Sequence, residues 1–154
     1  MSSVYVYNET TQPFPEDILT EITEQLLAEL APAGREMAVI LLSDEQILEQ
    51  NYAHRGEAEA TDVLSYSLHE GAVAMPDTPL LGDVFISLDT AERQAAERGI
   101  SLFEEVLVLA AHGLTHLLGF DHQTDAEWEP FITNQQRVLR LAGYDPIGGA
   151  RYRA

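Results

Sequence analysis

Three histidines stand close together in one segment of the chain, HGLTHLLGFDH at residues 112–122. His112 and His116 are four positions apart, so on a helix both side chains project from one face, a turn apart. Gly119 is suited to the left-handed conformation that ends a helix, and the resulting turn brings His122 back towards the other two. Three neutral imidazoles with water in the fourth position make a catalytic zinc site. The spacing therefore predicts one zinc ion bound by His112, His116 and His122.

The same spacing occurs in the metzincin proteases, but a residue that their chemistry needs is replaced here. Those enzymes carry a glutamate after the first histidine, which is the general base, and a methionine turn after the third histidine. This chain has Gly113 in the glutamate position and no methionine beyond Met75. A metzincin-like peptidase is therefore an alternative that the sequence disfavours.

Gly113 also lies inside a predicted helix, where glycine costs about 1 kcal/mol relative to alanine. Close approach of substrate or water to that face of the helix is one explanation. Tight packing against a neighbouring helix or strand is the other. The sequence leaves both explanations open.

The composition is that of one folded domain. The chain has 154 residues, a common domain size, and 45% of them are hydrophobic. It has no cysteine, which excludes thiolate ligands and fits a reducing compartment. The sequence shows neither a signal-peptide pattern nor an apolar run long enough to cross a bilayer. We therefore expect a cytoplasmic protein without membrane contact.

The charge balance is strongly acidic. The chain carries 26 acidic residues against eight arginines, with no lysine, for a net charge of −18. Such a surface repels nucleic acid at long range but is compatible with a small, locally positive arginine-lined cleft. Adaptation to high salt, which screens the self-repulsion, is an alternative explanation of the acidity.

Hydrophobic periodicity predicts the element order β-α-β-α-β-β-α-α-α. The helix that delivers the first two histidines is apolar nearly all round, which is typical of a buried central helix. We therefore expect an α+β single domain, a four-stranded mixed sheet with this buried central helix packed on it, and a mobile tail at residues 143–154. Strands are predicted at residues 4–7, 37–42, 61–68 and 81–88, with the second central and the last two paired as a hairpin, and helices at residues 16–30, 43–52, 89–99, 101–116 and 124–141.

Several local signals set the expected helix boundaries. Pro130 is expected to kink the last helix. The polar segment at residues 51–60 is expected to be a connection between a helix and a strand. Capping pairs, in which a short polar residue is followed three positions later by glutamine or glutamate, are Ser43–Gln46, Asp89–Glu92, Ser101–Glu104 and Thr124–Glu127.

Beyond its spacing, the histidine segment resembles the signature of a known family. HGLTHLLGFDH looks like the signature of the YbeY family of bacterial rRNA maturation endoribonucleases. TDVLSY at residues 61–66 and LGDVFIS at residues 81–87 are similar to its two other motifs, and residues 51–55 resemble its asparagine-containing segment that ends in an arginine. Two positions depart from the family pattern: His54 replaces the usual tyrosine, and Ala60 replaces a frequent proline.

The resemblance implies a metal-dependent, single-strand-specific endoribonuclease in maturation of the 3′ end of 16S rRNA and in ribosome quality control. It implies one YbeY-like hydrolase domain over residues 1–154, with zinc on the three histidines and a functional Arg55. The implied partners are single-stranded rRNA, the small ribosomal subunit and its assembly proteins. The alternative is a ribosome-assembly factor with a structural zinc, which requires a fourth protein ligand such as Asp121 or Asp125.

Arg55 and Asp121 are the candidate catalytic residues. Phosphodiester cleavage needs an activated water or 2′-hydroxyl, for which zinc is suited, and a cation for the developing phosphorane charge, for which a guanidinium is suited. Asp121 is a possible base, since Gly113 cannot be one. Apart from the resemblance, the favoured interpretation of Arg55 is a surface salt bridge with Glu57 or Glu59, and the resemblance reverses that preference.

Other residues near these motifs have two possible roles. Asp62, Asp83 and Asp121 are candidate partners of the histidine N–H groups, or else caps and turn residues. His69 is interpreted as an ordinary polar residue. Three aromatic residues are candidates for stacking on bases, although core packing is their commoner use, and these are Tyr66, Phe85 and Phe120.

Overall fold

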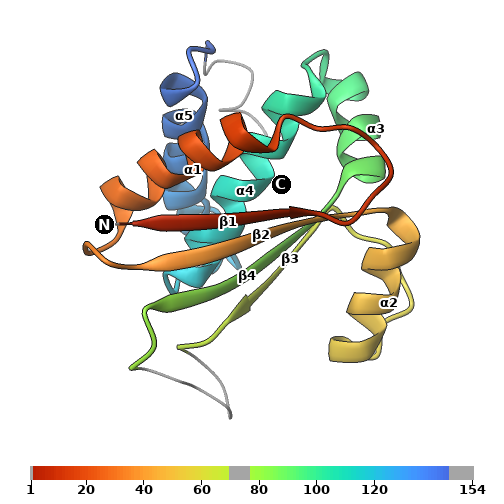
Figure 1. The fold of residues 1–154 in the computed structure, drawn as a ribbon, viewed down its shortest axis with the longest axis horizontal. Coiled ribbons are helices and arrows are strands. Elements are labelled where there is room, and N and C mark those ends of the chain that lie inside the picture. Colours follow the sequence, from red (N-terminus) through yellow and green to blue (C-terminus); the bar gives the residue numbers. More distant parts are fainter. Residues whose placement is uncertain (1, 70–76, 146–154) are drawn as a thin grey trace.

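The computed structural model describes residues 2–69 and 77–145. Within these residues, five α-helices and a four-stranded mixed sheet form a single α+β domain, as the sequence predicts (Figure 1). The expected mobile tail lies mostly outside the described residues. The elements are β1 (Ser3–Asn8), α1 (Glu16–Leu30), β2 (Glu36–Leu42), α2 (Asp44–Arg55), β3 (Val63–Ser67), β4 (Leu80–Ser87), α3 (Leu88–Arg98), α4 (Leu102–Leu117), the short 3₁₀ helix η1 (Ala126–Trp128) and α5 (Glu129–Leu141).

The sheet has the strand order β1-β2-β4-β3. β1 and β4 both run parallel to β2, which is central as predicted. β3 runs antiparallel to β4, from the pair Val63 and Ile86 to the pair Ser67 and Gly82, so the predicted hairpin is confirmed. β3 is consequently an edge strand, and it lies on the side of the sheet where α4 ends.

The two faces of the sheet are covered unequally. Helices α1, α3, α4 and α5 lie on one side, and α2 alone lies on the other (Figure 1). The main core joins α4 to β2 and β4 through side chains such as Met37, Val84 and Leu107. A smaller cluster around Leu42 and Ile47 joins α2 to the opposite face. Because both surfaces of the sheet are partly covered, its central strands are nearly uniform in hydrophobicity.

Helix α4 is the buried centre of the domain. Every residue from Glu105 to Thr115 on this helix is buried, which confirms the expectation drawn from its nearly continuous apolar surface. Ser101 and Glu104 form the predicted capping box at its start. Among the described residues no single helix is long and apolar enough to cross a membrane. Helices α3 and α4 meet that criterion only jointly, across a bend of 113°.

Helix α2 is longer than predicted. It continues through Arg55 and ends at Gly56, whose φ of 71° is the left-handed conformation of a helix C-terminus. The expected connection at residues 51–60 was therefore wrong for its first five residues. The helix presents few apolar side chains to the sheet, since Ile47 and Asn51 are its buried residues. Hydrophobic periodicity is consequently too weak to mark its last turn.

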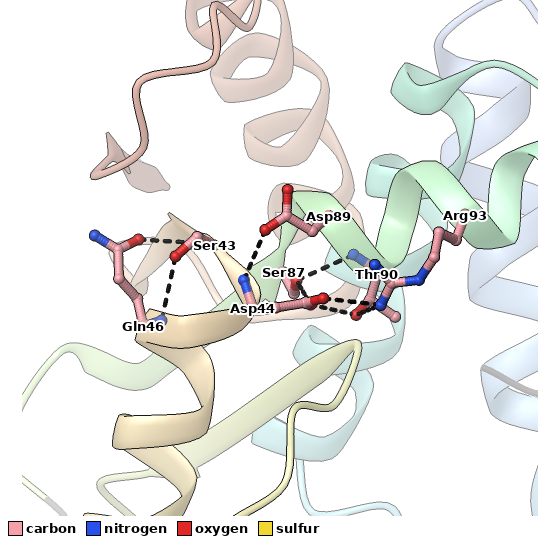
Figure 2. A network of polar contacts seen from close by, with 7 residues as sticks. All are labelled: Ser43, Asp44, Gln46, Ser87, Asp89, Thr90 and Arg93. Carbon is pink, nitrogen blue, oxygen red and sulfur yellow. Dashed lines mark hydrogen bonds and ion pairs between the residues drawn. The ribbon is translucent and has the colours of Figure 1, made fainter.

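The start of α3 also differs from the prediction. The cap is Ser87, whose hydroxyl accepts from the N–H of Thr90 at 3.1 Å. Asp89 instead caps the neighbouring helix, because its carboxylate accepts from the N–H of Asp44 at 2.8 Å (Figure 2). The predicted pairing of Asp89 with Glu92 was wrong because the carboxylate of Asp89 turns to another helix start.

Asp44 completes this junction between α2 and α3. Its carboxylate accepts from Ser87 at 2.7 Å, from Thr90 at 2.6 Å and from Arg93 at 2.9 Å (Figure 2). Burial raises the pKa of the Asp44 carboxyl, but the hydrogen bonds from Thr90, Ser87 and Arg93 outweigh burial and lower that pKa below its ordinary value. The junction holds α2, and with it Arg55, against the body of the domain.

The last helix begins later than predicted. Thr124 and Glu127 do bond reciprocally, but they open η1, and α5 starts only at Glu129. Pro130 therefore lies in the first turn of α5, where its missing N–H is harmless, and not in the helix interior. The predicted kink was wrong for this reason.

Candidate active site

The three predicted histidines converge at the C-terminal end of α4. His112 and His116 lie one turn apart on the helix, which ends at Leu117. Gly119 has φ 99°, and the chain then turns back so that His122 approaches the helix. One ring nitrogen from each histidine lies within 4.8 Å of the others. The spacing of the three histidines thus predicted their convergence correctly.

Hydrogen bonds orient two of the imidazoles. Nδ1 of His116 lies 3.1 Å from the carbonyl oxygen of Phe120. Because a carbonyl can only accept, this nitrogen carries the proton and Nε2 has the free lone pair. Nε2 of His116 lies 3.2 Å from Nε2 of His122, so the two nitrogens face one another. Two facing ring nitrogens of this kind are suited to binding one cation between them.

The third imidazole is the most buried. Nδ1 of His112 is buried and has no hydrogen-bond partner among the described residues. Burial, followed by the charges of His116 and His122, lowers the pKa of His112 to about 3. Burial and His122 also lower the pKa of His116, against an opposing effect of the Phe120 carbonyl. Both rings are therefore neutral at physiological pH, the form that binds a metal, and the donor set fits zinc.

Two aromatic side chains form the wall behind the histidines. Trp128 stacks on His122 with ring centroids 4.0 Å apart. The ring centroid of Phe131, which is fully buried, lies 4.8–4.9 Å from all three imidazoles. Sequence reasoning missed both residues. Their three-residue spacing across η1 and α5 was visible, but nothing local connected it with the histidines.

The histidines open into a polar cavity of about 720 Å³ between the end of α4, the edge strand β3 and the end of α2. Its walls combine one cation, two carboxylates, two serine hydroxyls and the imidazoles. It is the place where the predicted metal ligands and both candidate catalytic residues meet. The cavity is lined by Arg55, Asp62, Val63, Ser65, Ser67, His112, His116, Leu117, Gly119, Phe120, Asp121 and His122.

Arg55 reaches this cavity from the last turn of α2. No ion pair joins it to Glu57 or Glu59, both of which lie in the described part of the chain. Its positive charge acts on the site, because it contributes to lowering the pKa of His116. Arg55 is exposed and lines the cavity, so its functional role stays a prediction that this position supports.

Asp121 lines the cavity but is partly engaged already. Its Oδ1 accepts from the main-chain N–H of His122 at 2.8 Å, and its Oδ2 accepts from Gln123 at 3.1 Å. The hydrogen bond from His122 is the main cause that lowers the pKa of Asp121. The group is consequently an ionised carboxylate near neutral pH, able to accept a proton but weakly basic.

The other acidic candidates do not contact the histidine rings. Asp62 lines the cavity, but its carboxylate accepts from Val63 N–H at 2.8 Å and from Gln94 at 3.3 Å. Asp83 lies outside the cavity lining, and burial raises its pKa. Among the described residues the observed partner of a histidine ring nitrogen is the Phe120 carbonyl. Of the two roles left open for these aspartates, hydrogen bonding to an imidazole is not the one observed.

Gly113 is explained by packing. A Cβ atom placed there would lie 2.5 Å from Cγ1 of Val84 and 3.1 Å from the hydroxyl of Ser65. The helix is therefore pressed against β4 and β3 at this point. Of the two explanations that the sequence left open, tight packing against a neighbouring strand is the one observed.

The candidate stacking residues separate into two groups. Tyr66 and Phe85 pack against each other at 5.6 Å in the small cluster under α2, with His54 on Tyr66 at 4.6 Å. Phe120 is exposed and lines the cavity, so it alone of the three is placed to meet a base. His69 contacts the Leu80 carbonyl at 3.2 Å, in keeping with an ordinary polar role.

Comparison with known proteins shows which family the chain belongs to. The sequence matches the family described as "Endoribonuclease YbeY" over residues 5–143. The chain belongs to the YbeY family. The resemblance drawn from the motifs is thereby confirmed, and the YbeY match extends well beyond residues 51–122, through β1 and α5.

Similar YbeY proteins support this membership. Endoribonuclease YbeY of Thermus thermophilus is 52% identical over 117 residues, which cover 75% of this chain and 83% of the relative. The Bacillus licheniformis protein of the same name is 36% identical over 153 residues, which cover 93% of this chain and 97% of the relative. The solution structure of TM1509 from Thermotoga maritima has a TM-score of 0.65 and 25% identity, over 91% of this chain and 89% of that one.

Proposed function

We propose that this YbeY chain is a zinc-dependent endoribonuclease that cleaves single-stranded rRNA and matures the 3′ end of 16S rRNA. The observation that carries the proposal is the convergence of three histidines in a polar cavity that also contains Arg55. The names of the relatives, which are endoribonucleases, support the reaction class. The family resemblance seen in the motifs supports the specific substrate.

The residues of the cavity have complementary roles in this reaction. His112, His116 and His122 would hold the zinc ion, which would supply Lewis acidity for activating water near neutral pH and for stabilising charge on the phosphate. Arg55 donates to a non-bridging phosphate oxygen, where negative charge grows in the transition state. Asp121 accepts a proton from the attacking hydroxyl as its oxygen bonds to phosphorus. The bond from phosphorus to the leaving sugar oxygen breaks in the same step, and solvent protonates that oxygen.

Two features favour catalysis over the alternatives. Neither Asp121 nor Asp125 joins the group of three histidines among the described residues, so the donor set matches an open catalytic site better than a closed structural one. A peptidase of the metzincin type needs a glutamate where Gly113 stands. The contact with Val84 leaves no room there for a side chain, which counts against a peptidase.

We further propose that the enzyme acts on rRNA in the cytoplasm, on the small ribosomal subunit and together with its assembly proteins. The net charge of −18 is the reason for proposing that a ribosomal particle brings the enzyme and its RNA together. A chain of this charge meets free RNA poorly, whereas a bound particle replaces that encounter with a high effective concentration.

The test is metal analysis followed by a cleavage assay. The purified protein is expected to contain about one zinc per chain and to cleave single-stranded but not duplex RNA. A chelator is expected to stop cleavage, and added zinc to restore it. His116→Ala serves as the control that separates this enzyme from a contaminating nuclease. Cleavage that persists in that variant, or that ignores the chelator, would refute the proposal.

A further inference from the structure

The outer edge of β3 carries main-chain groups that face away from the sheet. The N–H of Ser87 donates to the Asp62 carbonyl and the N–H of Leu68 donates to the Leu81 carbonyl, both at 2.9 Å. In an antiparallel pair, residues that exchange such bonds alternate with residues whose N–H and C=O groups point the other way. With the observed register, the residues whose N–H and C=O groups point away from β4 are Val63, Ser65 and Ser67.

Two of these three residues offer donors. The N–H of Val63 is engaged, because it donates to the carboxylate of Asp62 at 2.8 Å. The N–H groups of Ser65 and Ser67 point outward, and no strand in the described part of the chain pairs with this edge. An edge strand in this state is a template for an extended chain, which binds through the main-chain groups.

The same edge borders the active-site cavity. The side chains of Val63, Ser65 and Ser67 line it together with the histidines, and Arg55 stands in the same lining. Figure 1 shows β3 as the outermost strand, on the side of the sheet opposite β1. An extended chain on this edge therefore passes directly along the cavity that contains the candidate metal ligands.

The outward carbonyls of this edge only accept, so a phosphate would contact its N–H groups alone, and the small side chains beside the edge favour a polyanion over a peptide. A peptide strand gains its specificity from pockets for alternate side chains, but the positions beside this edge are two small serines. Main-chain N–H groups commonly bind phosphate oxygens and position a nucleic acid without reading its sequence. The nearest acid on the strand, Asp62, already accepts from Val63 and Gln94.

We propose that the outer edge of β3 binds the sugar–phosphate backbone of the RNA substrate, with the N–H groups of Ser65 and Ser67 donating to successive phosphates. This rests on the proposed function and deepens it. The edge aligns a single strand along the cavity so that one phosphate reaches Arg55 and the histidines. A duplex does not present one extended backbone in this way, which accounts for single-strand preference.

The direct test is Ser67→Pro. Proline removes the outward N–H, leaves the hydrogen bonds between β3 and β4, and is tolerated on edge strands. The expected result is an approximately tenfold weaker binding of single-stranded RNA, the effect of losing one hydrogen bond to a charged group, with the fold and the zinc content retained. Ser67→Ala, which removes only the hydroxyl, separates its contribution from that of the N–H. Unchanged RNA affinity in folded, zinc-loaded Ser67→Pro would overturn the proposal.

The matched control is Val6→Pro on the opposite edge of the sheet. The N–H of Ser3 donates to the carbonyl of Arg35, just before β2, and the N–H of Glu9 donates to the carbonyl of Leu41 in β2. By the alternation of a parallel pair, the N–H of Val6 therefore faces outward too. Val6 is not part of the cavity lining. RNA affinity is expected to stay within about twofold of wild type. An equal loss of affinity in both proline variants would overturn the assignment to β3.

A second measurement does not depend on the proline variant folding. Zinc-loaded Arg55→Ala protein is used because it is expected to leave the RNA uncleaved during the measurement. In this protein, the amide NMR signals of Ser65 and Ser67 are expected to move on addition of a single-stranded RNA oligonucleotide. Neutral methylphosphonate linkages are expected to abolish these shifts. RNA that binds without moving the two signals, or a strand-forming peptide that moves them when RNA does not, would overturn the proposal. Wild-type protein that neither binds nor cleaves RNA would instead refute the proposed function.

Discussion

The indole of Trp128 lies flat on the imidazole of His122, with ring centroids 4.0 Å apart and an interplanar angle of 20°. His122 is the one histidine of the three that follows α4, in a segment without regular structure. The stack therefore supports the one histidine of the three that the helix itself does not position. Trp128 is also the only tryptophan in the chain, so its emission reports on this position alone.

Replacing Trp128 with alanine is expected to weaken zinc binding by about tenfold or more, as for other residues that orient metal ligands. Trp128→Phe keeps an aromatic face, so its zinc affinity is expected to lie between those of the alanine variant and the wild type. Affinity is measured by competition with a chelator. In the wild type, zinc is expected to change tryptophan fluorescence, and His122→Ala is expected to abolish that response. Identical zinc affinity in the alanine and wild-type proteins would assign Trp128 to packing alone.

The buried His112 makes the stability of the metal-free protein dependent on pH. Its folded-state pKa of about 3 lies below the ordinary histidine value of 6.5, so below that value the unfolded chain binds a proton that the folded chain does not. Stability is therefore expected to fall as pH drops from about 6.5 towards 3, by about 2 kcal/mol at pH 5 from this group. Urea unfolding of chelator-treated protein at pH 7 and pH 5 measures this difference in the free energy of unfolding. His112→Gln is expected to flatten the dependence, and an equally steep dependence in that variant would contradict this account.

Arg55→Ala is expected to keep the fold and the zinc but to lose RNA cleavage by about 10²-fold or more, because it removes a cation from the developing phosphorane charge. Arg55→Lys restores charge but not the bidentate contact, so only partial rescue is expected. Single-turnover cleavage and zinc content are measured side by side. An alanine variant that cleaves at the wild-type rate would return Arg55 to the surface-residue interpretation.

Gly113→Ala is expected to destabilise the protein by about 1–3 kcal/mol, although alanine favours helices. The reason is the 2.5 Å separation between the added Cβ and Cγ1 of Val84. Val84→Ala in the same chain removes the clash, so the double variant is expected to recover part of the loss, as coupled neighbours do. Chemical denaturation of the single and double variants tests this. Additive losses would show that Val84 is not the obstacle.

The acidic surface predicts an unusual salt response. Raising salt from a low to a moderate concentration is expected to speed encounter with free single-stranded rRNA, because repulsion is screened over a Debye length of about 10 Å at 0.1 M. If the arginine-lined cleft dominates RNA binding, the affinity for RNA is instead expected to fall steadily as salt is raised. Binding of an rRNA fragment across this range distinguishes the two. Tight binding at low salt that declines monotonically would contradict the need for a ribosomal partner.

Short-range patterns in the sequence determined much of this protein. The capping boxes at Ser43 and Ser101 form as predicted, because each depends on residues three positions apart. The candidate metal ligands His112 and His116 are likewise placed by the pitch of one helix, and Gly119 turns His122 towards them. Local geometry is sufficient for all of these, since it does not require knowledge of which element packs on which.

Only the tertiary structure decided the surroundings of the site. Trp128 meets His122, Gly113 meets Val84, and Asp89 caps a helix that begins 45 positions earlier in the chain. Each contact joins elements whose relative placement depends on packing of the whole core, and no periodicity or motif encodes it. The outward edge of β3 has the same origin. Its serines are ordinary strand residues in the sequence, and they become an unpaired edge beside a cavity only because β3 pairs with β4 alone.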